Sequence, residues 1–271
     1  MSERIAIVGF PLDENSSYLR GCAEAPPLIR AALFSNASHL TSETGRDLGA
    51  GSSMFDAGDV SLGSGKVALL EIERAVSALL DRGLSPVSLG GDHAIAYPTV
   101  KAVARKYPGL AVLQFDAHPD LYDVYEGNRF SHACPFARIL EEGAVSRLVQ
   151  VGIRTMNAHQ RAQAARFGVE VIEMRDWRDD LVLEFDAPLY VSFDIDALDP
   201  AFAPGVSHRE PGGLSVRQAL RVVQSLKGTV IGADIVEYNP RVDASNVTAV
   251  VCAKLVKELA SKILDSGGAP P

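Results

Sequence analysis

Short apolar runs alternate with segments of helical periodicity over most of the chain, and this alternation limits the folds open to it. Seven of the runs are rich in β-branched residues and are bounded by Gly, Pro or Asp, which is typical of buried strands. These predicted strands are Ile5–Val8, Val87–Leu89, Leu110–Phe115, Leu148–Ile153, Glu170–Met174, Leu189–Ser192 and Val230–Val236. Strands that alternate with helices pair in parallel, and the helices cover both faces of the sheet. The predicted fold is therefore α/β, a single-domain three-layer α/β/α sandwich with a mostly parallel central sheet.

Five segments have the spacing of apolar residues that is typical of helices. They are Gly65–Asp81, Cys134–Glu142, Ala158–Phe167, Ser215–Leu226 and Asn246–Leu264. The apolar stripe predicted for the first of them runs through Val67, Leu70, Val76 and Leu80. The first three helices are followed by Gly83, Gly143 and Gly168, where a left-handed C-terminal cap is expected. Ser215 is expected to be the N-cap of the fourth.

No shift in composition marks a boundary within the 271 residues, and a chain of this length can bury a substantial core in one domain. We expect that domain to comprise residues 1–265, followed by a flexible tail at 266–271. Segment Thr41–Ser53, rich in Gly, Ser and charged residues, is expected to be irregular.

Charge and cysteine content limit the partners and the location. The chain has 26 Lys and Arg against 34 Asp and Glu, a net charge of −8, and so is not expected to bind nucleic acid. No apolar stretch approaches the roughly 20 residues that span a membrane. The three cysteines are far apart, which argues against a disulfide scaffold. Because the first residues resemble neither a signal peptide nor a transit peptide, we expect a reduced, cytoplasmic protein.

Four of the apolar strands run directly into segments that are rich in acidic residues or histidine. These segments end at His93, Asp120, Asp196 and Glu237. In open α/β sheets, ligands bind just beyond the carboxyl ends of the strands. We therefore expect the four segments to converge on one crevice.

Two of these segments place like charges side by side. Residues that alternate in extended backbone point to one side, so Asp116, His118 and Asp120 face the same way, as do Asp194 and Asp196. Neighbouring carboxylates repel each other unless a cation lies between them. With the histidine of GGDH, the set has two imidazoles and four carboxylates, whose charge of −4 balances two divalent cations.

Each part of this set also has a simpler explanation. A lone histidine at a strand end is more often a hydrogen-bonded structural residue, and a lone pair of aspartates is more often part of a turn. The six residues together favour a binuclear metal site. Oxygen ligands favour Mn²⁺ or Mg²⁺ over Zn²⁺, and two histidines favour a transition metal, so two Mn²⁺ ions are the expected cofactor.

Three motifs together resemble those of the ureohydrolases, the arginase and agmatinase family: GGDHAIAYP (90–98), DAHPDLYD (116–123) and SFDIDALDPAFAPG (192–205). Further segments resemble arginases of the plant type and their bacterial relatives, among them NSSYLRGCAEAPPLIRAAL (15–33), EGNRFSHACPFARILEEG (126–143), LVQVGIR (148–154), GVSHREPGGLS (205–215) and GADIVEYNP (232–240). The resemblance covers almost the whole chain, except for residues 36–53 and the C-terminal tail.

The resemblance implies a binuclear Mn²⁺ site that hydrolyses a guanidinium group to urea and an amine. It assigns one ion to His93, Asp116, Asp120 and Asp194. It assigns the other ion to Asp116, His118, Asp194 and Asp196. This ligand set agrees with the one reached from the balance of charge.

The resemblance also implies two catalytic residues and an assembly. Glu237 matches the family glutamate that pairs with the guanidinium, and His132 matches a histidine that moves protons. The alternative for His132 is a structural role at the start of a helix. The family further suggests a homotrimer or homohexamer.

The substrate expected from the resemblance is L-arginine, hydrolysed to L-ornithine and urea. The alternative is agmatine, hydrolysed to putrescine and urea, or another guanidino acid. Animal-type arginases carry a different set of residues after two of the motifs, where this chain has Leu121-Tyr122-Asp123 and Thr155-Met156-Asn157. Asn157 and His208 are the further candidates for contact with the substrate.

Four further residues lie within or beside the motifs. Asp92, Asp199 and Asp234 are expected either to orient ligands or to cap turns. Cys134 is expected to pack as a small apolar residue rather than to act as a nucleophile.

Two rival classes stay open. A zinc deacetylase of related fold uses one metal and fewer carboxylates. The other rival is an inactive relative that serves as a binding or regulatory subunit, although such proteins usually lose ligands and all six are present here.

Overall fold

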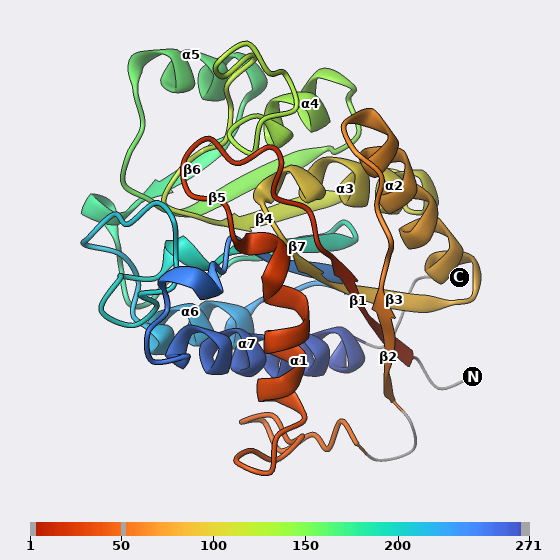
Figure 1. Cartoon of the computed structure of the whole chain (residues 1–271). Coiled ribbons are helices and arrows are strands. Elements are labelled where there is room, and N and C mark those ends of the chain that lie inside the picture. The colour runs from red at the N-terminus through yellow and green to blue at the C-terminus, as the bar shows by residue number, and fades with distance from the viewer. Residues whose placement is uncertain (1–3, 50–52, 267–271) are drawn as a thin grey trace.

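Eight strands form one sheet in which neighbouring strands run parallel, in the order β2-β1-β3-β8-β7-β4-β5-β6 (Figure 1). The computed structural model describes residues 4–49 and 53–266. The strands are β1 (Arg4–Phe10), β2 (Met54–Asp59), β3 (Leu84–Gly90), β4 (Ala111–Phe115), β5 (Arg147–Ile153), β6 (Glu170–Glu173), β7 (Leu189–Asp194) and β8 (Val230–Val236).

Helices cover both faces of this sheet, which confirms the predicted three-layer fold (Figure 1). One layer contains α2 (Lys66–Asp81), α3 (Ala96–Lys106), α4 (Pro135–Glu141) and α5 (Ala158–Phe167). The other contains α1 (Ala25–Leu33), α6 (Val216–Ser225) and α7 (Val247–Asp265). Short 3₁₀ turns complete the connections: η1 (Cys22–Glu24), η3 (His93–Ile95), η4 (Met174–Asp176), η5 (Ile195–Ala197) and η6 (Pro240–Val242).

The apolar core consists of two clusters, one on each face of the sheet. In β1, Ile5 and Ile7 belong to the cluster beneath α1, α6 and α7, whereas Ala6 and Val8 belong to the cluster beneath α2 and α3. Successive side chains of a strand point to opposite faces, so a sheet covered on both sides needs apolar residues at consecutive positions. This requirement explains why the central strands appear in the sequence as continuous apolar runs.

Three elements were absent from the sequence prediction. β2 has the sequence MFDAGD, lies at the sheet edge and pairs only with β1, so it has no apolar run to reveal it. α1 and α3 each carry proline near the start, Pro26 and Pro27 in α1 and Pro98 in α3. Proline in the first turn interrupts no helical hydrogen bond, so it marks the start of these helices rather than a break.

The apolar stripe predicted for α2 is partly wrong. Val67 and Leu70 are 55% and 50% exposed, respectively. The buried face instead contains Leu69, Ile72 and Val76, whose spacing of three and four residues is that of one helix face. The helix has apolar residues on more than one side, so the sequence alone does not determine which side is buried.

The predicted helix ends agree with the structure. Gly83, Gly143 and Gly168 have φ values of 73°, 62° and 66°, the left-handed conformation expected after a helix. Ser215 caps α6 through a reciprocal capping box with Gln218. In the predicted irregular segment, the described residues 41–49 hold one isolated bridge and no helix or strand. Of the predicted tail 266–271, residues 267–271 lie outside the described range.

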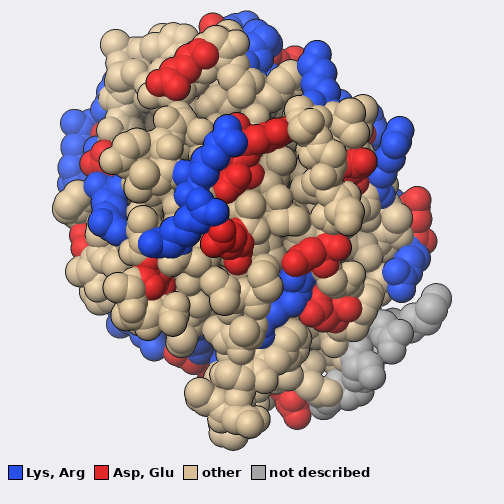
Figure 2. Space-filling model, in the orientation of Figure 1, with Lys and Arg blue, Asp and Glu red and all other residues tan. Residues whose placement is uncertain are grey.

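Acidic and basic side chains are interspersed on the described surface that Figure 2 shows, and neither sign forms a continuous field there.

Candidate functional site

The strand order brings the four polar strand ends to one place. β3, β8, β7 and β4 are consecutive neighbours and run in the same direction. His93 follows β3, Glu237 follows β8, Asp194 ends β7 and Asp116 follows β4. The structure thus brings these segments together at the carboxyl edge of the sheet, where ligands bind in open α/β folds.

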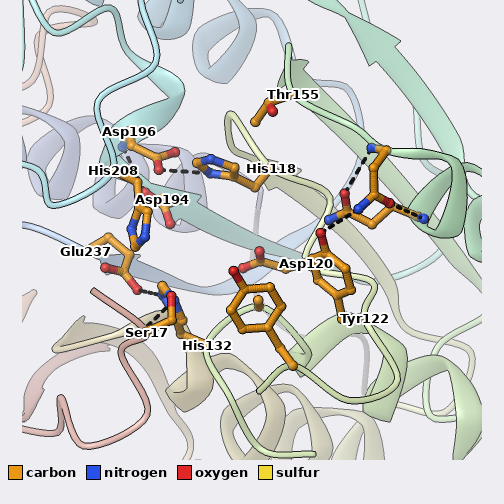
Figure 3. Close-up of a pocket in the computed structure, with 14 residues that line it drawn as sticks. Ser17, His118, Asp120, Tyr122, His132, Thr155, Asp194, Asp196, His208 and Glu237 are labelled. Carbon is orange, nitrogen blue, oxygen red and sulfur yellow. Dashed lines mark hydrogen bonds and ion pairs between the residues drawn. The ribbon is translucent and has the colours of Figure 1, made fainter. Parts of the chain in front are cut away.

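One pocket at this edge has a lining of two kinds (Figure 3). The part that we call the acidic floor comprises the six predicted metal ligands. His118, Asp120, Asp194 and Asp196 line the pocket, whereas His93 and Asp116 are fully buried and contact them without lining it. The part that we call the neutral rim comprises Tyr122, Tyr125, Thr155, Asn157 and Gln160. The remaining lining residues are Ser17, His132, Ala133, His208 and Glu237.

The buried His93 ring presents one nitrogen to three carboxylates of the floor. Its Nδ1 atom lies 3.1 Å from Asp116 Oδ2, 2.9 Å from Asp120 Oδ2 and 3.3 Å from Asp194 Oδ2. Its Nε2 atom lies 3.0 Å from Ser192 Oγ.

The tautomer of His93 follows from its second contact. Ser192 Oγ donates its single hydrogen to Asp234 Oδ1 at 2.7 Å, and Tyr190 OH donates to the other oxygen of Asp234 at 2.9 Å. Ser192 must therefore accept from His93 Nε2–H. In the neutral ring this leaves the lone pair of Nδ1 directed at the carboxylates, the arrangement that a metal-ligating histidine needs.

His118 forms a second group that shares Asp116 with the first. Its Nδ1 atom lies 3.1 Å from Asp196 Oδ2 (Figure 3). The same atom lies 3.5 Å from Asp116 Oδ1. The two groups that could each hold a metal ion are His93, Asp116 and Asp194, and Asp116, His118 and Asp196. Asp116 offers one oxygen to each group, so it lies between them.

Backbone hydrogen bonds hold the two acidic loops in place. Asp116 Oδ1 accepts from the His118 amide at 2.6 Å, and Asp194 Oδ1 accepts from the Asp196 amide at 2.8 Å. Asp120 has a φ of 51°, a conformation that is uncommon outside glycine and that persists where neighbouring contacts enforce it. The floor is therefore set by the loop backbone as well as by the side chains.

Three polar residues that support these loops were not identified from the sequence. Gln114 Nε2 donates to Asp116 Oδ2 at 2.7 Å, and Gln150 Nε2 donates to Gln114 Oε1 at 2.6 Å. Arg154 directs its guanidinium at five backbone carbonyls, including that of Asp196 at 2.6 Å. Gln114 and Gln150 interrupt apolar strands, and a polar residue inside a buried run was the signal that could have revealed them.

The electrostatics of the floor fit divalent cations. Burial and the charges of Asp196 and Asp116 raise the pKa of Asp194 well above its usual value. Burial and the charge of Asp116 raise the pKa of Asp120 to about 6. His93 Nδ1 is buried without a hydrogen-bond partner among the described residues, although three carboxylate oxygens surround it. A cation bound there would remove the repulsion and occupy that nitrogen, and the mixed oxygen and imidazole donors suit a transition metal.

Glu237, His132 and Ser17 form a chain of hydrogen bonds beside the floor (Figure 3). His132 Nδ1 lies 2.8 Å from Glu237 Oε1, and His132 Nε2 lies 2.8 Å from Ser17 Oγ. Glu237 Oε1 also accepts from the His93 amide at 2.9 Å. Glu237 has a φ of 65°, so the backbone of this residue is strained as well.

The pKa values of this pair are shifted in opposite directions. Burial lowers the pKa of His132, but the Glu237 carboxylate outweighs burial and raises the pKa to about 9. Burial raises the pKa of Glu237, but the charge and hydrogen bond of His132 outweigh it and lower the pKa to about 2. The two side chains therefore stabilise each other's charged form.

The other predicted contact residues lie at the pocket. Asn157 donates to Tyr122 OH at 2.7 Å and also caps α5 through a capping box with Gln160. The His208 ring lies 5.2 Å from the His132 ring and 5.9 Å from the His118 ring, between centroids. Burial, then the charge of His132, lowers the pKa of His208.

Asp234 and Asp199 were each expected either to orient a metal ligand or to cap a turn, and the structure gives them different roles. Asp234 supports His93 through Ser192, whereas Asp199 accepts from the amides of Ala201, Gly212 and Gly213 and so forms a turn.

Asp92 and Cys134 are both buried beside the site. Asp92 is fully buried and accepts from the amides of Asn15 and Ala94 at 2.9 Å and 3.1 Å. Cys134 is buried, and burial and the Asp120 charge raise the pKa of its thiol to about 12, which supports packing over nucleophilic chemistry.

Comparisons with known proteins agree with the motifs. A model described as the arginase family matches residues 3–261. An arginase of Arabidopsis thaliana, named arginase 1, mitochondrial, is 45% identical over an alignment of 275 residues that covers 95% of this chain and 80% of the relative. An agmatinase of Bacillus anthracis is 34% identical over 266 residues, which cover 94% of this chain and 90% of the relative. The solved structure of an arginase from Medicago truncatula matches with a TM-score of 0.93 at 43% identity, over 97% of this chain and 88% of that one.

The same comparisons correct the predicted location. The Arabidopsis relative is named mitochondrial, as are arginases of rice and Medicago truncatula at 45% and 44% identity, so the prediction of a cytoplasmic protein is wrong on this evidence. That prediction depended on unpaired cysteines and on the composition of the first residues. Reduced thiols are compatible with more than one compartment, so they do not specify a location. Within the described ranges, no helix has the length and apolar character needed to cross a membrane.

Proposed function

The chain belongs to the arginase family, and we propose that it is a metal-dependent hydrolase that splits L-arginine into L-ornithine and urea. In this reaction the bond between the guanidinium carbon and the substituted nitrogen breaks, the oxygen of water ends in urea, and the nitrogen leaves as an ammonium group. The enzyme class is a hydrolase of the C–N bonds of linear amidines.

One observation carries this proposal. Two buried groups of imidazole and carboxylate share Asp116 at the carboxyl edge of the sheet, and Glu237 and His132 lie beside them in the same pocket. A guanidinium carbon is a poor electrophile because resonance stabilises it. Its hydrolysis needs an activated water, an anion to orient the cation and a proton for the departing amine, and the pocket offers a residue for each need.

We propose that the floor holds two Mn²⁺ ions. His93, Asp116, Asp120 and Asp194 would hold one, and Asp116, His118, Asp194 and Asp196 the other. The shared position of Asp116 supports two ions over one, and with them an arginase-type centre over the one-metal deacetylase. Ions bound there would supply a water molecule of lowered pKa.

Glu237 orients the substrate, and His132 is the source of the proton for the nitrogen that leaves. The Glu237 carboxylate is buried and ionised, so it can pair with a guanidinium cation and orient it. His132 carries a proton to the nitrogen that leaves. A buried carboxylate and imidazole in contact exchange little with solvent, which keeps the proton within the site.

The rim supports arginine over agmatine. Its five residues carry no formal charge, whereas the far end of agmatine is a lone ammonium that gains from a carboxylate. The far end of arginine is a zwitterion of no net charge, which suits Asn157 and the tyrosine hydroxyls. Sequence identity also favours arginine as the substrate, because the chain is 45% identical to the Arabidopsis arginase and 34% identical to the Bacillus agmatinase. We further propose that His208 contacts the substrate and that the protein assembles as a homotrimer or homohexamer.

Urea release by the Mn²⁺-loaded protein from arginine, agmatine and other guanidino acids, measured in parallel, tests the proposal. We expect arginine to be preferred. A preference for agmatine would contradict the substrate and leave the chemistry intact. If none of the compounds released urea, the proposed function would be wrong. The two rival functions, a zinc deacetylase and an inactive relative, would then be the remaining candidates.

A further inference from the structure

We propose that Ser17 is the proton relay between His132 and the departing amine, an inference that rests on the proposed function above. Ser17 lies in the loop between β1 and η1 and lines the pocket with His132 and Glu237 (Figure 3). It is far in sequence from the strand-end motifs, and no metal ligand lies in its loop.

The loop that carries Ser17 is anchored on both sides of the site. Asp92 Oδ2 accepts from the Asn15 amide at 2.9 Å, and Asn15 O accepts from the His132 amide at 3.1 Å. Asn128 Nδ2 also donates to Asn15 Oδ1 at 3.3 Å. The loop is thereby tied to the segments of His93 and of His132, so the position of Ser17 relative to the ring is fixed by backbone contacts.

Ser17 presents two groups to one nitrogen of His132. Its amide N–H lies 3.2 Å from Nε2 and its hydroxyl lies 2.8 Å from the same atom. An amide N–H can only donate, so in the neutral ring Nε2 is the acceptor and the ring hydrogen is on Nδ1, which donates to Glu237. The order of hydroxyl, imidazole and carboxylate is that of the serine hydrolase triad, in which the acid sets the tautomer in the same way.

Neither ring nitrogen of His132 is free to reach a substrate directly. Nδ1 is occupied by Glu237 and Nε2 by Ser17. When Nε2 carries a proton, the Ser17 amide cannot accept it, whereas Oγ at 2.8 Å can. The hydroxyl is thus the acceptor through which a proton on Nε2 leaves the ring.

The proton balance of the relay is simple. The Nε2–H bond of protonated His132 breaks toward Ser17 Oγ while the Ser17 O–H bond breaks toward the nitrogen of the departing amine. The imidazolium loses one proton, the amine gains one, and the serine ends neutral, as it began. The proton on His132 derives from the attacking water and reaches Nε2 through the same hydroxyl: Ser17 Oγ takes a proton from the water while its own O–H proton passes to Nε2. The oxygen of that water ends in urea.

Ser17→Ala removes the hydroxyl and keeps the amide, so it tests the relay alone. We expect kcat for urea release to fall at least about tenfold, since positioned proton transfer contributes about 10²–10⁴. We expect the KM and the bound metal to stay within about twofold of the unaltered protein. Ser17→Thr keeps a hydroxyl and should restore most of kcat.

Ser16→Ala is the matched control. Its hydroxyl is buried and has no hydrogen-bond partner among the described residues, so its loss alters the same loop without touching the relay. We expect wild-type kcat from this variant. Equal losses in Ser16→Ala and Ser17→Ala, or unchanged kcat in Ser17→Ala, would overturn the proposal while urea release by the unaltered protein still supports the function.

A second measurement is independent of turnover. Nitrogen NMR of the full chain with labelled histidine, loaded with diamagnetic Mg²⁺ and recorded where the ring is neutral, reports the tautomer of His132. We expect hydrogen on Nδ1. Hydrogen on Nε2 would overturn the relay whether or not the protein releases urea.

Discussion

The acidic floor and the neutral rim of the pocket are built in different ways. The floor follows the ends of three central strands, β3, β7 and β4, and its most exposed side chain, His118, is only 24% exposed. The rim lies on the connections after β4 and β5 and on the first turn of α5, where Asn157 is exposed and Tyr122 is half-buried. Loops of this kind vary more readily than the strand ends that they surround. The difference indicates that sheet order determines the chemistry and the loops determine the substrate.

The two parts also differ in charge. The floor gathers four carboxylates, and burial together with the charges of Asp196 and Asp116 raises the pKa of Asp194, whereas the rim is held by hydrogen bonds between uncharged groups. A change in the floor should therefore alter metal binding and turnover together. A change in the rim should alter KM and substrate choice with the metals in place.

The largest effect is expected from Asp116→Asn. Asp116 offers an oxygen to each group of the floor, so its loss should release both ions and reduce urea release to background. Elemental analysis of the purified protein and a urea assay measure the two outcomes.

The control for that variant is Asp123→Asn. Asp123 also follows β4, but its side chain is 46% exposed and it does not line the pocket. It should keep its metals and its activity. If Asp116→Asn still bound two ions, Asp116 would not be a ligand that both ions share. The contrast between floor and rim would then be wrong as well.

A large effect that spares the metals is expected from Glu237→Gln. The amide keeps the size of the side chain and an acceptor for the His93 amide but removes the charge that orients a guanidinium. We expect kcat to fall about 10²–10³-fold, the usual loss for one preorganised electrostatic contact. Loss of metal would show that Glu237 is itself a metal ligand. Unchanged turnover would show that Glu237 does not act on the substrate.

An intermediate effect is expected from Ser192→Ala. The change leaves His93 Nε2–H without its acceptor and Asp234 without its Ser192 donor. Loss of a residue that orients a metal ligand typically costs 10- to 100-fold in metal affinity or activity. Titration of the metal-free variant with Mn²⁺ measures that affinity. Affinity equal to that of the unaltered protein would show that the loop backbone alone positions His93.

The sequence predicted the floor better than the rim, for a physical reason. A strand that ends in DAHPD or DID runs in one direction, and its side chains alternate between two sides. The local pattern and the shared edge of parallel strands therefore determine where its polar side chains lie. Ser17 and Tyr125 reach the pocket through long-range loop packing, which no local pattern encodes. The fold shows a similar contrast. The buried central strands are evident from the sequence because their apolar runs are continuous, whereas the half-exposed edge strand β2 has no such run.

The smallest and most specific effect is expected from Asn157→Asp. Asp is as good an N-cap as Asn, so α5 keeps its cap while the rim gains one carboxylate. That charge should favour the ammonium of agmatine over the zwitterion of arginine. Because an exposed ion pair contributes up to about 1 kcal/mol, we expect the ratio of kcat/KM for agmatine over arginine to rise by up to about fivefold.

Ser215→Ala separates the capping role of Asn157 from its role in the rim. Ser215 forms the same capping box on α6, away from the pocket, so its loss should cost about 1 kcal/mol of unfolding free energy without changing the substrate ratio. Asn157→Ala should lose a similar stability and also raise the KM for arginine. If Asn157→Asp left the substrate ratio unchanged, the far end of the substrate would lie elsewhere, with His208 the next candidate, and the rim as defined would not select the substrate.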